Sequence, residues 1–183
     1  MHHQQLRCFA CMKKQPAIDC ILSSFAFETT LRHVLHRYKY HEGLYLTAFL
    51  ATLMLEALPT HYTTQCLIPI PMHRAQLKRR GYNQAQLLAQ YLGRAIHRPV
   101  NTSHCEKIRD TANQAGLSAR MRQGNLRHAF LVKKIPYRHV TLVDDLITTG
   151  STTNELACTL KRTGVERVDV WCCAKTVLTE FDA

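Results

Sequence analysis

A short apolar strand followed by two carboxylates and a hydroxyl-rich loop constrains this chain more than any other feature. The segment 139–153 reads HVTLVDDLITTGSTT. Its run Val140 to Val143 is apolar and β-branched, which is typical of a strand buried on both faces. Asp144 and Asp145 follow at the end of this strand. We then expect a helix that begins near residue 153 and runs to about residue 163.

The loop after the two carboxylates has the composition of an anion-binding site. Its residues are Thr148, Thr149, Gly150, Ser151 and Thr152. Backbone N–H groups at a helix start have no partners within the helix and attract anions, and hydroxyls around a glycine add donors. Adjacent carboxylates would repel a phosphate unless they bind sugar hydroxyls or share a metal ion with it. A ribose phosphate meets both conditions, so the segment resembles the phosphoribosyl pyrophosphate (PRPP) signature of type I phosphoribosyltransferases.

This segment is also compatible with more common structural roles. Asp and Thr are common helix N-caps, and strand–loop–helix turns occur throughout α/β proteins. No lysine follows the glycine as a P-loop requires, and the chain has no G-x-G-x-x-G sequence. The order of strand, carboxylate pair and Thr-Thr-Gly-Ser-Thr therefore favours a phosphoribosyl site over the nucleotide motifs.

Length and charge indicate one domain with an affinity for polyanions. The chain has 183 residues and a formal net charge of +11, and a chain of this length suits one domain of ordinary size, with room for a small appendage. Basic residues concentrate in the middle of the sequence. This charge favours a pyrophosphate sugar or a nucleic-acid backbone, although a solvated basic surface without a ligand is also compatible with it.

Targeting signals are not evident, and a cytoplasmic protein is expected. Polar and basic residues interrupt every apolar run in the first thirty positions, unlike a signal peptide. The most apolar window, 44–58, is too short and too amphipathic to span a bilayer, so no membrane insertion is expected. In the cytoplasm, the eight cysteines are expected to be thiols or metal ligands rather than disulfides.

Periodicity predicts strands that alternate with helices. Helices are expected from Thr29 or Thr30, over 44–58, over 83–96, and as a short basic helix capped by Ser118; strands are expected over 65–70, 100–108, 130–132 and 168–173. In the helix 44–58, Leu46, Phe49, Leu50 and Leu53 are expected to face inward. Alternating strands and helices form a mostly parallel, wound sheet flanked by helices. Ligands of such sheets bind at the carboxyl ends of the strands, where the two carboxylates fall.

A basic segment follows the first of these strands. Residues 68–84 read IPIPMHRAQLKRRGYNQ, which puts Arg74, Lys78, Arg79 and Arg80 at the loop edge of the sheet. Arginine offers planar pairs of donors that suit phosphate oxygens. Taken alone this is also an ordinary basic loop, but a pyrophosphate beside the carboxylate loop would need such a positive partner.

Four motifs, in a fixed order along the chain, point to one family among the proteins with such a signature. They are Ile68-Pro-Ile-Pro-x-His-Arg, Lys78-Arg-Arg-Gly-Tyr-Asn-Gln84, Arg109-Asp-Thr-Ala-Asn-Gln114 and Asn125-Leu-Arg-x-Ala-Phe130, and Arg37-Tyr-Lys-Tyr40 precedes them. In this order and spacing they resemble the ComF/GntX family, whose members are amidophosphoribosyltransferase-like proteins linked to natural competence and DNA uptake. The resemblance extends from about residue 8 to residue 175. It implies a type I phosphoribosyltransferase fold over 25–183, with a helical hood at about 25–64 and a core at about 65–178.

The resemblance also implies roles for individual residues. Asp144 and Asp145 would bind the ribose 2′ and 3′ hydroxyls, and Thr148 to Thr152 would hold the 5′-phosphate. Mg²⁺ would bridge pyrophosphate and ribose oxygens. Met72, His73 and Arg74 would form a pyrophosphate loop, assisted by Arg79 or Arg80. Residues 109–116, which include Arg109, Asn113 and Gln114, would form a flexible loop. The hood around Lys39 and Tyr40 would contact the acceptor.

Residues 1–24 are expected to form a separate cysteine-rich module. Cys8-x-x-Cys11 and Cys20 fit three ligands of a zinc knuckle, since thiolates are the usual ligands of structural zinc. Serine at position 23 replaces the last cysteine of the second family pair, so His2 or His3 could be the fourth ligand. Family members often have a further cysteine cluster upstream, which leaves open whether the chain begins within the module. The other cysteines, Cys66, Cys105, Cys158, Cys172 and Cys173, are expected to be core thiols.

The resemblance and the basic charge leave three candidate functions. The first is a cytoplasmic competence protein that binds PRPP with Mg²⁺ and acts on incoming DNA together with other competence or DNA-processing proteins. The second is a non-catalytic accessory that binds single-stranded DNA and keeps the PRPP site as a sensor or relic; the scattered Tyr82, Tyr91 and Tyr137 offer few stacking platforms for it. The third, a regulator of the purine-repressor type, would need an additional DNA-reading domain. No residue pattern identifies an acceptor for the sugar.

Overall fold

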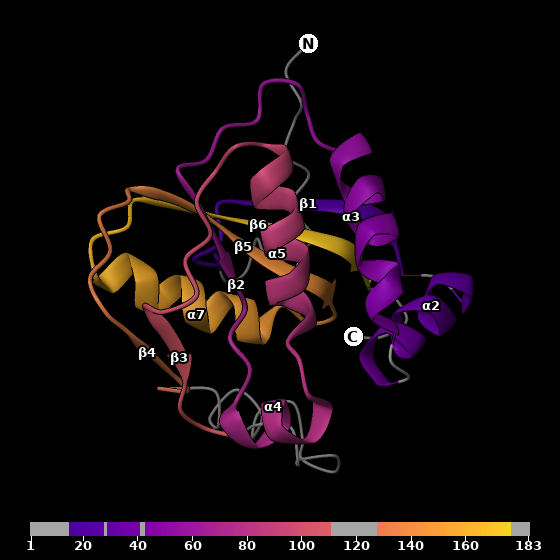
Figure 1. The fold of residues 1–183 in the computed structure, drawn as a ribbon. Helices are drawn as coiled ribbons and strands as arrows, with labels where there is room; N and C mark the ends of the chain where they lie inside the picture. Colours follow the sequence, from indigo (N-terminus) through magenta and orange to yellow (C-terminus); the bar gives the residue numbers. More distant parts are fainter. Residues whose placement is uncertain (1–14, 28, 41–42, 111–127, 177–183) are drawn as a thin grey trace.

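The main sheet consists of four parallel strands. The computed structural model describes residues 15–27, 29–40, 43–110 and 128–176 (Figure 1). Strands β1 (Cys20–Ala26), β6 (Arg167–Lys175), β5 (His139–Ile147) and β2 (Cys66–Pro69) follow one another in this order, and each neighbouring pair is parallel. A separate antiparallel pair joins β3 (Cys105–Lys107) to β4 (Phe130–Val132). The prediction of a mostly parallel α/β sheet is confirmed.

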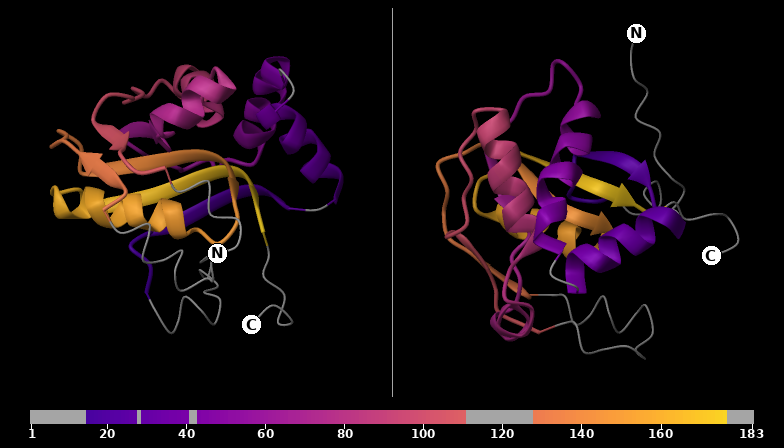
Figure 2. Two further views of the ribbon diagram at one scale, coloured as in Figure 1. Left: turned by 90° about the horizontal axis from the view of Figure 1, so that it is seen from below. Right: turned by 45° about the vertical axis from the view of Figure 1, so that its right-hand side comes forward.

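Helices cover both faces of this sheet. The hood consists of α2 (Thr29–Tyr40), the 3₁₀ turn η1 (Gly43–Tyr45) and α3 (Leu46–Glu56). The hood and α5 (Gln84–Ala95) lie on one face, and α7 (Ser151–Arg162) lies on the other (Figure 2, left). Helix α4 (Arg74–Arg80) connects the end of β2 to α5. None of the helices among the described residues is long and apolar enough to cross a membrane.

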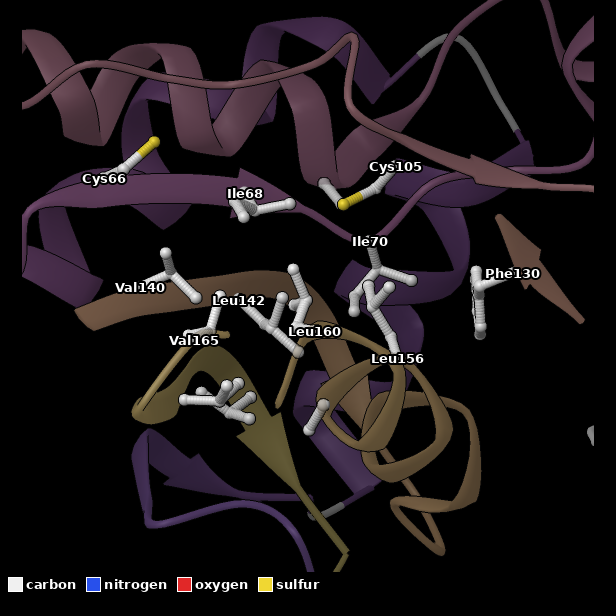
Figure 3. Close-up of a cluster of buried hydrophobic side chains, with 14 of the residues drawn as sticks. Cys66, Ile68, Ile70, Cys105, Phe130, Val140, Leu142, Leu156, Leu160 and Val165 are labelled. Carbon is white, nitrogen blue, oxygen red and sulfur yellow. The ribbon is translucent and has the colours of Figure 1, made fainter. Parts of the chain in front are cut away.

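Strand alternation divides the hydrophobic core into two layers. Side chains of alternate residues along a strand point to opposite faces of the sheet. Val140 and Leu142 of β5 pack with Leu156 and Leu160 of α7 (Figure 3). Val143, the next residue, belongs instead to the layer beneath α2, α3 and α5. Because β5 is buried on both faces, its apolar run is continuous, as the sequence indicated.

Several elements differ from the prediction. Strand β1 was not predicted, and the expected module boundary at residue 24 falls inside it. The expected strand 100–108 is reduced to Cys105–Lys107 and a single bridge between Val100 and Leu67. The predicted inward position of Phe49 is wrong, because its side chain is 55% exposed while Ala51 and Met54 are buried. The basic helix expected after Ser118 lies outside the described residues.

Candidate functional site

The carboxylate pair lies inside strand β5 rather than after it. The expected strand ended at Val143, whereas β5 continues to Ile147 and pairs Asp144 with Cys172 of β6. Strand β2 ends beside it, since the Ile70 N–H donates to the Val143 carbonyl at 2.9 Å. The two strands are parallel, so their carboxyl ends meet at one edge of the sheet. The segment that follows β2 therefore starts next to the two carboxylates.

The turn between β5 and α7 has the geometry of a helix N-terminal anion site. Gly150 has φ 70° and ψ 3°, a left-handed conformation that glycine adopts without a steric penalty. The hydroxyls of Thr149 and Ser151 lie 3.0 Å apart on either side of it. Helix α7 begins at Ser151, earlier than the predicted residue 153, so Ser151 and Thr152 are in its first turn. The N–H groups of a first helical turn lack partners within the helix and attract anions. Here the Ser151 N–H donates to Oγ1 of Thr149 at 3.4 Å, a long bond that an anion could replace.

Lys39 of the hood reaches the carboxylate pair. Its Nζ lies 3.0 Å from Oδ2 of Asp145, whose side chain is only 6% exposed. Burial opposes the positive charge of Lys39, but the neighbouring Asp145 and Asp144 outweigh it and raise the pKa of this lysine. Asp145 shares the β5 face of Val143, which the hood covers. The family resemblance implied that the hood around Lys39 contacts the acceptor, and nothing in the sequence indicated this ion pair.

The two carboxyl groups influence one another. The Asp145 N–H donates to Oδ1 of Asp144 at 2.9 Å, which folds the Asp144 side chain back onto the strand. Burial, and then the negative charge of Asp145, raise the pKa of Asp144 well above its usual value, although Lys39 acts in the opposite direction. Bringing like charges together in a desolvated site has this effect in general. A positive charge or a hydrogen-bond donor brought beside Asp144 would therefore favour the ionised form of this carboxyl group.

The residues predicted for the pyrophosphate are distributed over α4 and its N-cap. Nδ1 of His73 accepts a hydrogen bond from the Ala75 N–H at 3.3 Å and caps the helix. Arg74 instead pairs with Glu106 of β3, at 3.0 Å. Arg80 is half-buried and donates to Oε1 of Gln84 at 3.0 Å. Met72 is half-buried beside His73, and Arg79 is exposed.

The flexible-loop prediction is only partly within the described residues. Asn113 and Gln114 lie outside them, as does the side chain of Tyr40 in the hood, while Arg109 is exposed at the start of the loop. Asp110, next to Arg109, accepts a hydrogen bond from Gln76 of α4 at 3.0 Å. The start of the loop is therefore joined to the helix that carries the predicted pyrophosphate arginines.

Lys107 is a site residue that the sequence analysis did not single out. It is 9% exposed, at an inward position of β3. Burial lowers its pKa, whereas Asp110 and Asp144 act to raise it, so the ammonium group lies within the field of both carboxylates. The signal in the sequence was weak: in the three-residue strand Cys105-Glu-Lys107, alternation puts the lysine on the same side as a core cysteine.

The cysteine predictions have different outcomes. Cys66, Cys105, Cys172 and Cys173 are buried free thiols, which confirms their assignment to the core. Cys158 is a half-buried free thiol of α7 that belongs to neither buried cluster. Cys8 and Cys11 lie outside the described residues. Cys20 is in β1, where burial and Asp169 raise the pKa of its thiol and so oppose the thiolate form that zinc binds. Among the described positions no group of three potential ligands is assembled, and the zinc site stays a prediction.

Fold and site together define the class of protein. An all-parallel sheet with helices on both faces, an acidic strand end beside a hydroxyl-rich turn, and a helical hood over that edge form a type I phosphoribosyltransferase fold. The parallel strands direct their carboxyl ends to one edge of the sheet, and sheets of this kind bind their ligands at that edge.

Comparison with known proteins then identifies the family. The chain is 36% identical over 174 residues to "Competence protein F" of Haemophilus influenzae, covering 90% of this chain and 76% of that protein. It is 34% identical over 182 residues to "DNA utilization protein YhgH" of Escherichia coli K12, covering 96% and 80%. The chain therefore belongs to the ComF family.

The chain was also compared with family models and with solved structures. No family model matches the sequence. Among solved structures, the chain is similar to a purine phosphoribosyltransferase from Pyrococcus horikoshii, with a TM-score of 0.35 and 19% identity over 75% of this chain and 78% of that one. The parallel sheet, the glycine turn and the hood of this chain define its fold independently of that similarity.

Proposed function

We propose that this protein binds PRPP together with Mg²⁺ at the carboxyl edge of its sheet. The observation that carries the proposal is the position of Asp144 and Asp145 beside the Gly150 turn, with the hood lysine Lys39 3.0 Å from Asp145. Carboxylates accept hydrogen bonds from sugar hydroxyls, and an adjacent helix N-terminus suits a phosphate. One ligand of ribose and phosphate would satisfy both groups.

The surrounding residues complete this assignment. Asp144 and Asp145 would orient the ribose, and the N–H groups and hydroxyls of 148–152 would hold the 5′-phosphate. Arg79, Arg80 and His73 would bind the pyrophosphate, because α4 starts directly after the β2 edge. The carboxylate oxygens fit Mg²⁺, which prefers oxygen ligands and is commonly held by carboxylates together with substrate phosphates. When bound, Mg²⁺ would neutralise charge on the pyrophosphate.

The proposed biological role concerns DNA that enters the cell. Two relatives carry the names competence protein and DNA utilization protein. The net charge of +11 favours polyanions, and Arg74, Lys78 and Arg79 are exposed on one short helix. We therefore infer a cytoplasmic role on incoming single-stranded DNA, together with other DNA-processing proteins.

Calorimetric titration tests the PRPP proposal. Binding should be saturable and strengthened by Mg²⁺, and replacing Asp144 and Asp145 together by alanine should weaken it by at least about tenfold. Glu166→Ala is the matched control, because Glu166 is an exposed carboxylate paired with Arg138 at the opposite end of the sheet. Equal affinity in the double variant and in the parent protein would remove the carboxylates from the site.

A second candidate function is a DNA-binding accessory whose PRPP site no longer acts. The exposed arginines of α4 favour it. A transformation assay separates the two functions. We expect the Asp144 and Asp145 variants to lose transformation while still binding DNA, because both halves of the PRPP site are present in one chain. Normal transformation by these variants, combined with failure of an Arg79 and Arg80 double variant, would support the accessory function instead.

A further inference from the structure

Gln84 is a buried side chain that uses both ends of its amide. It is 2% exposed at the start of α5. Its Oε1 accepts a hydrogen bond from Nη1 of Arg80 at 3.0 Å, and its Nε2 donates to the backbone carbonyl of Lys39 at 3.3 Å. Gln84 therefore joins α4 to the last turn of the hood helix α2. An amide fits this position because a single side chain must both accept and donate.

Neighbouring contacts hold the same turn of α2. The hydroxyl of Tyr82 donates to the Tyr38 carbonyl at 2.7 Å. The hydroxyl of the buried Tyr38 lies 3.1 Å from Oγ1 of Thr47 and donates to the Gln84 carbonyl at 3.3 Å. The last carbonyls of a helix have no partners within the helix, so bonds from outside determine how its end is placed. Here these bonds come from Tyr82 and Gln84, in the segment that follows α4.

This arrangement connects the two halves of the site through four residues. Arg80 contacts Gln84, Gln84 contacts the backbone of Lys39, and the Lys39 ammonium contacts Asp145 at 3.0 Å. Arg80 is on the side assigned to pyrophosphate, and Asp145 is on the side assigned to ribose. The Lys39 ammonium lies against Oδ2 of Asp145, so a ribose hydroxyl that binds this oxygen would displace the ammonium.

We propose that Gln84 is a positioning residue that couples pyrophosphate binding to ribose binding, an inference that rests on the proposed PRPP function. When pyrophosphate draws the guanidinium of Arg80, the Arg80–Gln84 bond changes, and the bond from Gln84 to the Lys39 carbonyl transmits the change to the end of α2. The Lys39 ammonium then moves with its backbone and releases Asp145 for the ribose hydroxyls. Coupling of this kind is reciprocal, so ribose binding strengthens pyrophosphate binding by the same factor.

Two half-ligands measure this coupling directly. The probes are Mg²⁺-pyrophosphate and 1,4-anhydroribitol 5-phosphate, a ribose 5-phosphate analogue without the anomeric oxygen that would collide with pyrophosphate. Each is titrated by calorimetry alone and in the presence of the other at saturation. In the parent protein we expect each half-ligand to strengthen the other by at least about fivefold, with the same factor in both directions.

Gln84→Met removes both hydrogen bonds while keeping an unbranched side chain of similar size. We expect the coupling factor to fall to about one, while each half-ligand alone keeps its affinity within about threefold. If Gln84 had a purely structural role, the variant would bind each half-ligand more weakly, and the coupling factor between the two half-ligands would stay as in the parent. Gln90→Met in the same helix is the matched control, since Gln90 is half-buried outside this series of contacts, and it should keep the coupling of the parent.

Tyr82→Phe is the second variant, which tests the inference even if Gln84→Met does not fold. It removes one hydroxyl that holds the same turn of α2 and should reduce the coupling without abolishing it. Parent-like coupling in a folded Gln84→Met or Tyr82→Phe protein would overturn the inference, as would independent binding of the two probes to the parent. If neither probe nor PRPP binds the parent protein, the proposed function itself fails.

Discussion

Lys39 Nζ and Asp145 Oδ2 are 3.0 Å apart, and this contact joins the hood to the carboxyl end of the central strand β5. The lysine is 23% exposed and the aspartate 6%. Removing one partner of a buried ion pair leaves the other charge without compensation. The pair therefore affects both the stability of the hood and access to the candidate ribose site.

We expect Lys39→Met to lower the free energy of unfolding by about 1–3 kcal/mol, because Asp145 then remains desolvated without a counter-ion. Adding Asp145→Asn to this variant should recover most of the loss. Urea denaturation at neutral pH measures the free energy of unfolding of the single and the double variant. Arg138→Met, which breaks the exposed pair with Glu166, is the control and should change the value by about 0–1 kcal/mol. An equal loss in the single and the double variant would contradict the prediction.

Asp144→Asn should stabilise the protein at neutral pH and have less effect in acid. Burial and Asp145 raise the pKa of Asp144, so the folded state holds its proton more tightly than the unfolded state. The ionised Asp144 therefore lowers the free energy of unfolding. This loss is absent below the ordinary pKa of 3.8, grows as the pH rises toward the raised pKa, and is complete above it. Denaturant unfolding of parent and variant across this range measures the difference. A variant advantage that grows as the pH falls would contradict the sign.

Lys107→Met should also stabilise the ligand-free protein at neutral pH, by about 0.5–2 kcal/mol, because it removes a buried charge. Burial lowers the pKa of Lys107, so the charged lysine reduces the free energy of unfolding. This loss is present below the folded-state pKa and disappears as the pH approaches 10.5. The same variant should bind PRPP about tenfold more weakly if the ammonium faces the phosphates. Thermal unfolding and calorimetry check the two effects, and unchanged PRPP affinity would exclude Lys107 from the site.

A pair of glycines separates a role in phosphate binding from the effect of backbone strain alone. Gly150 and Gly164 have φ of 70° and 102°, and a Cβ would meet no close contact at either position. Alanine at each should therefore cost about 1–2 kcal/mol through the left-handed conformation alone. Gly150→Ala should also weaken PRPP binding, because it disturbs the N-terminus of α7, whereas Gly164→Ala should not. Equal PRPP affinity in the two variants would place the phosphate elsewhere.

Single-stranded DNA binding should be weak, independent of sequence and steeply dependent on salt. Replacing Arg79 and Arg80 together by alanine should reduce the slope of log affinity against log salt by about 1.4, since each phosphate contact in single strands contributes roughly 0.7. Replacing Asp144 and Asp145 should leave DNA binding unchanged or improve it, because negative charge is removed. Fluorescence titrations at several salt concentrations measure the slopes. An unchanged slope in the arginine variant would place the DNA on another surface.

Local elements of the fold and site followed from contiguous sequence. The apolar run of β5, the carboxylates Asp144 and Asp145, and the glycine turn into α7 are adjacent residues, so composition and order were enough to predict them in sequence, although the strand extends past the carboxylates. Amphipathic periodicity likewise predicted α5, because its apolar stripe has a 3.6-residue period. Boundaries were less accurate, since neighbouring strands and caps determine where an element ends.

Tertiary structure decided the relationships between distant segments. Strand β1 forms because β6 supplies parallel partners for a segment whose serines weaken its own strand pattern. Phe49 is exposed because the packing of α3, rather than its hydrophobicity, decides which residues of that helix face inward. The sequence determined which chemical groups the site contains. Only the fold brought Lys39 to Asp145 and Gln84 between Arg80 and the hood, because such contacts depend on how helices pack against the sheet and leave no local periodicity.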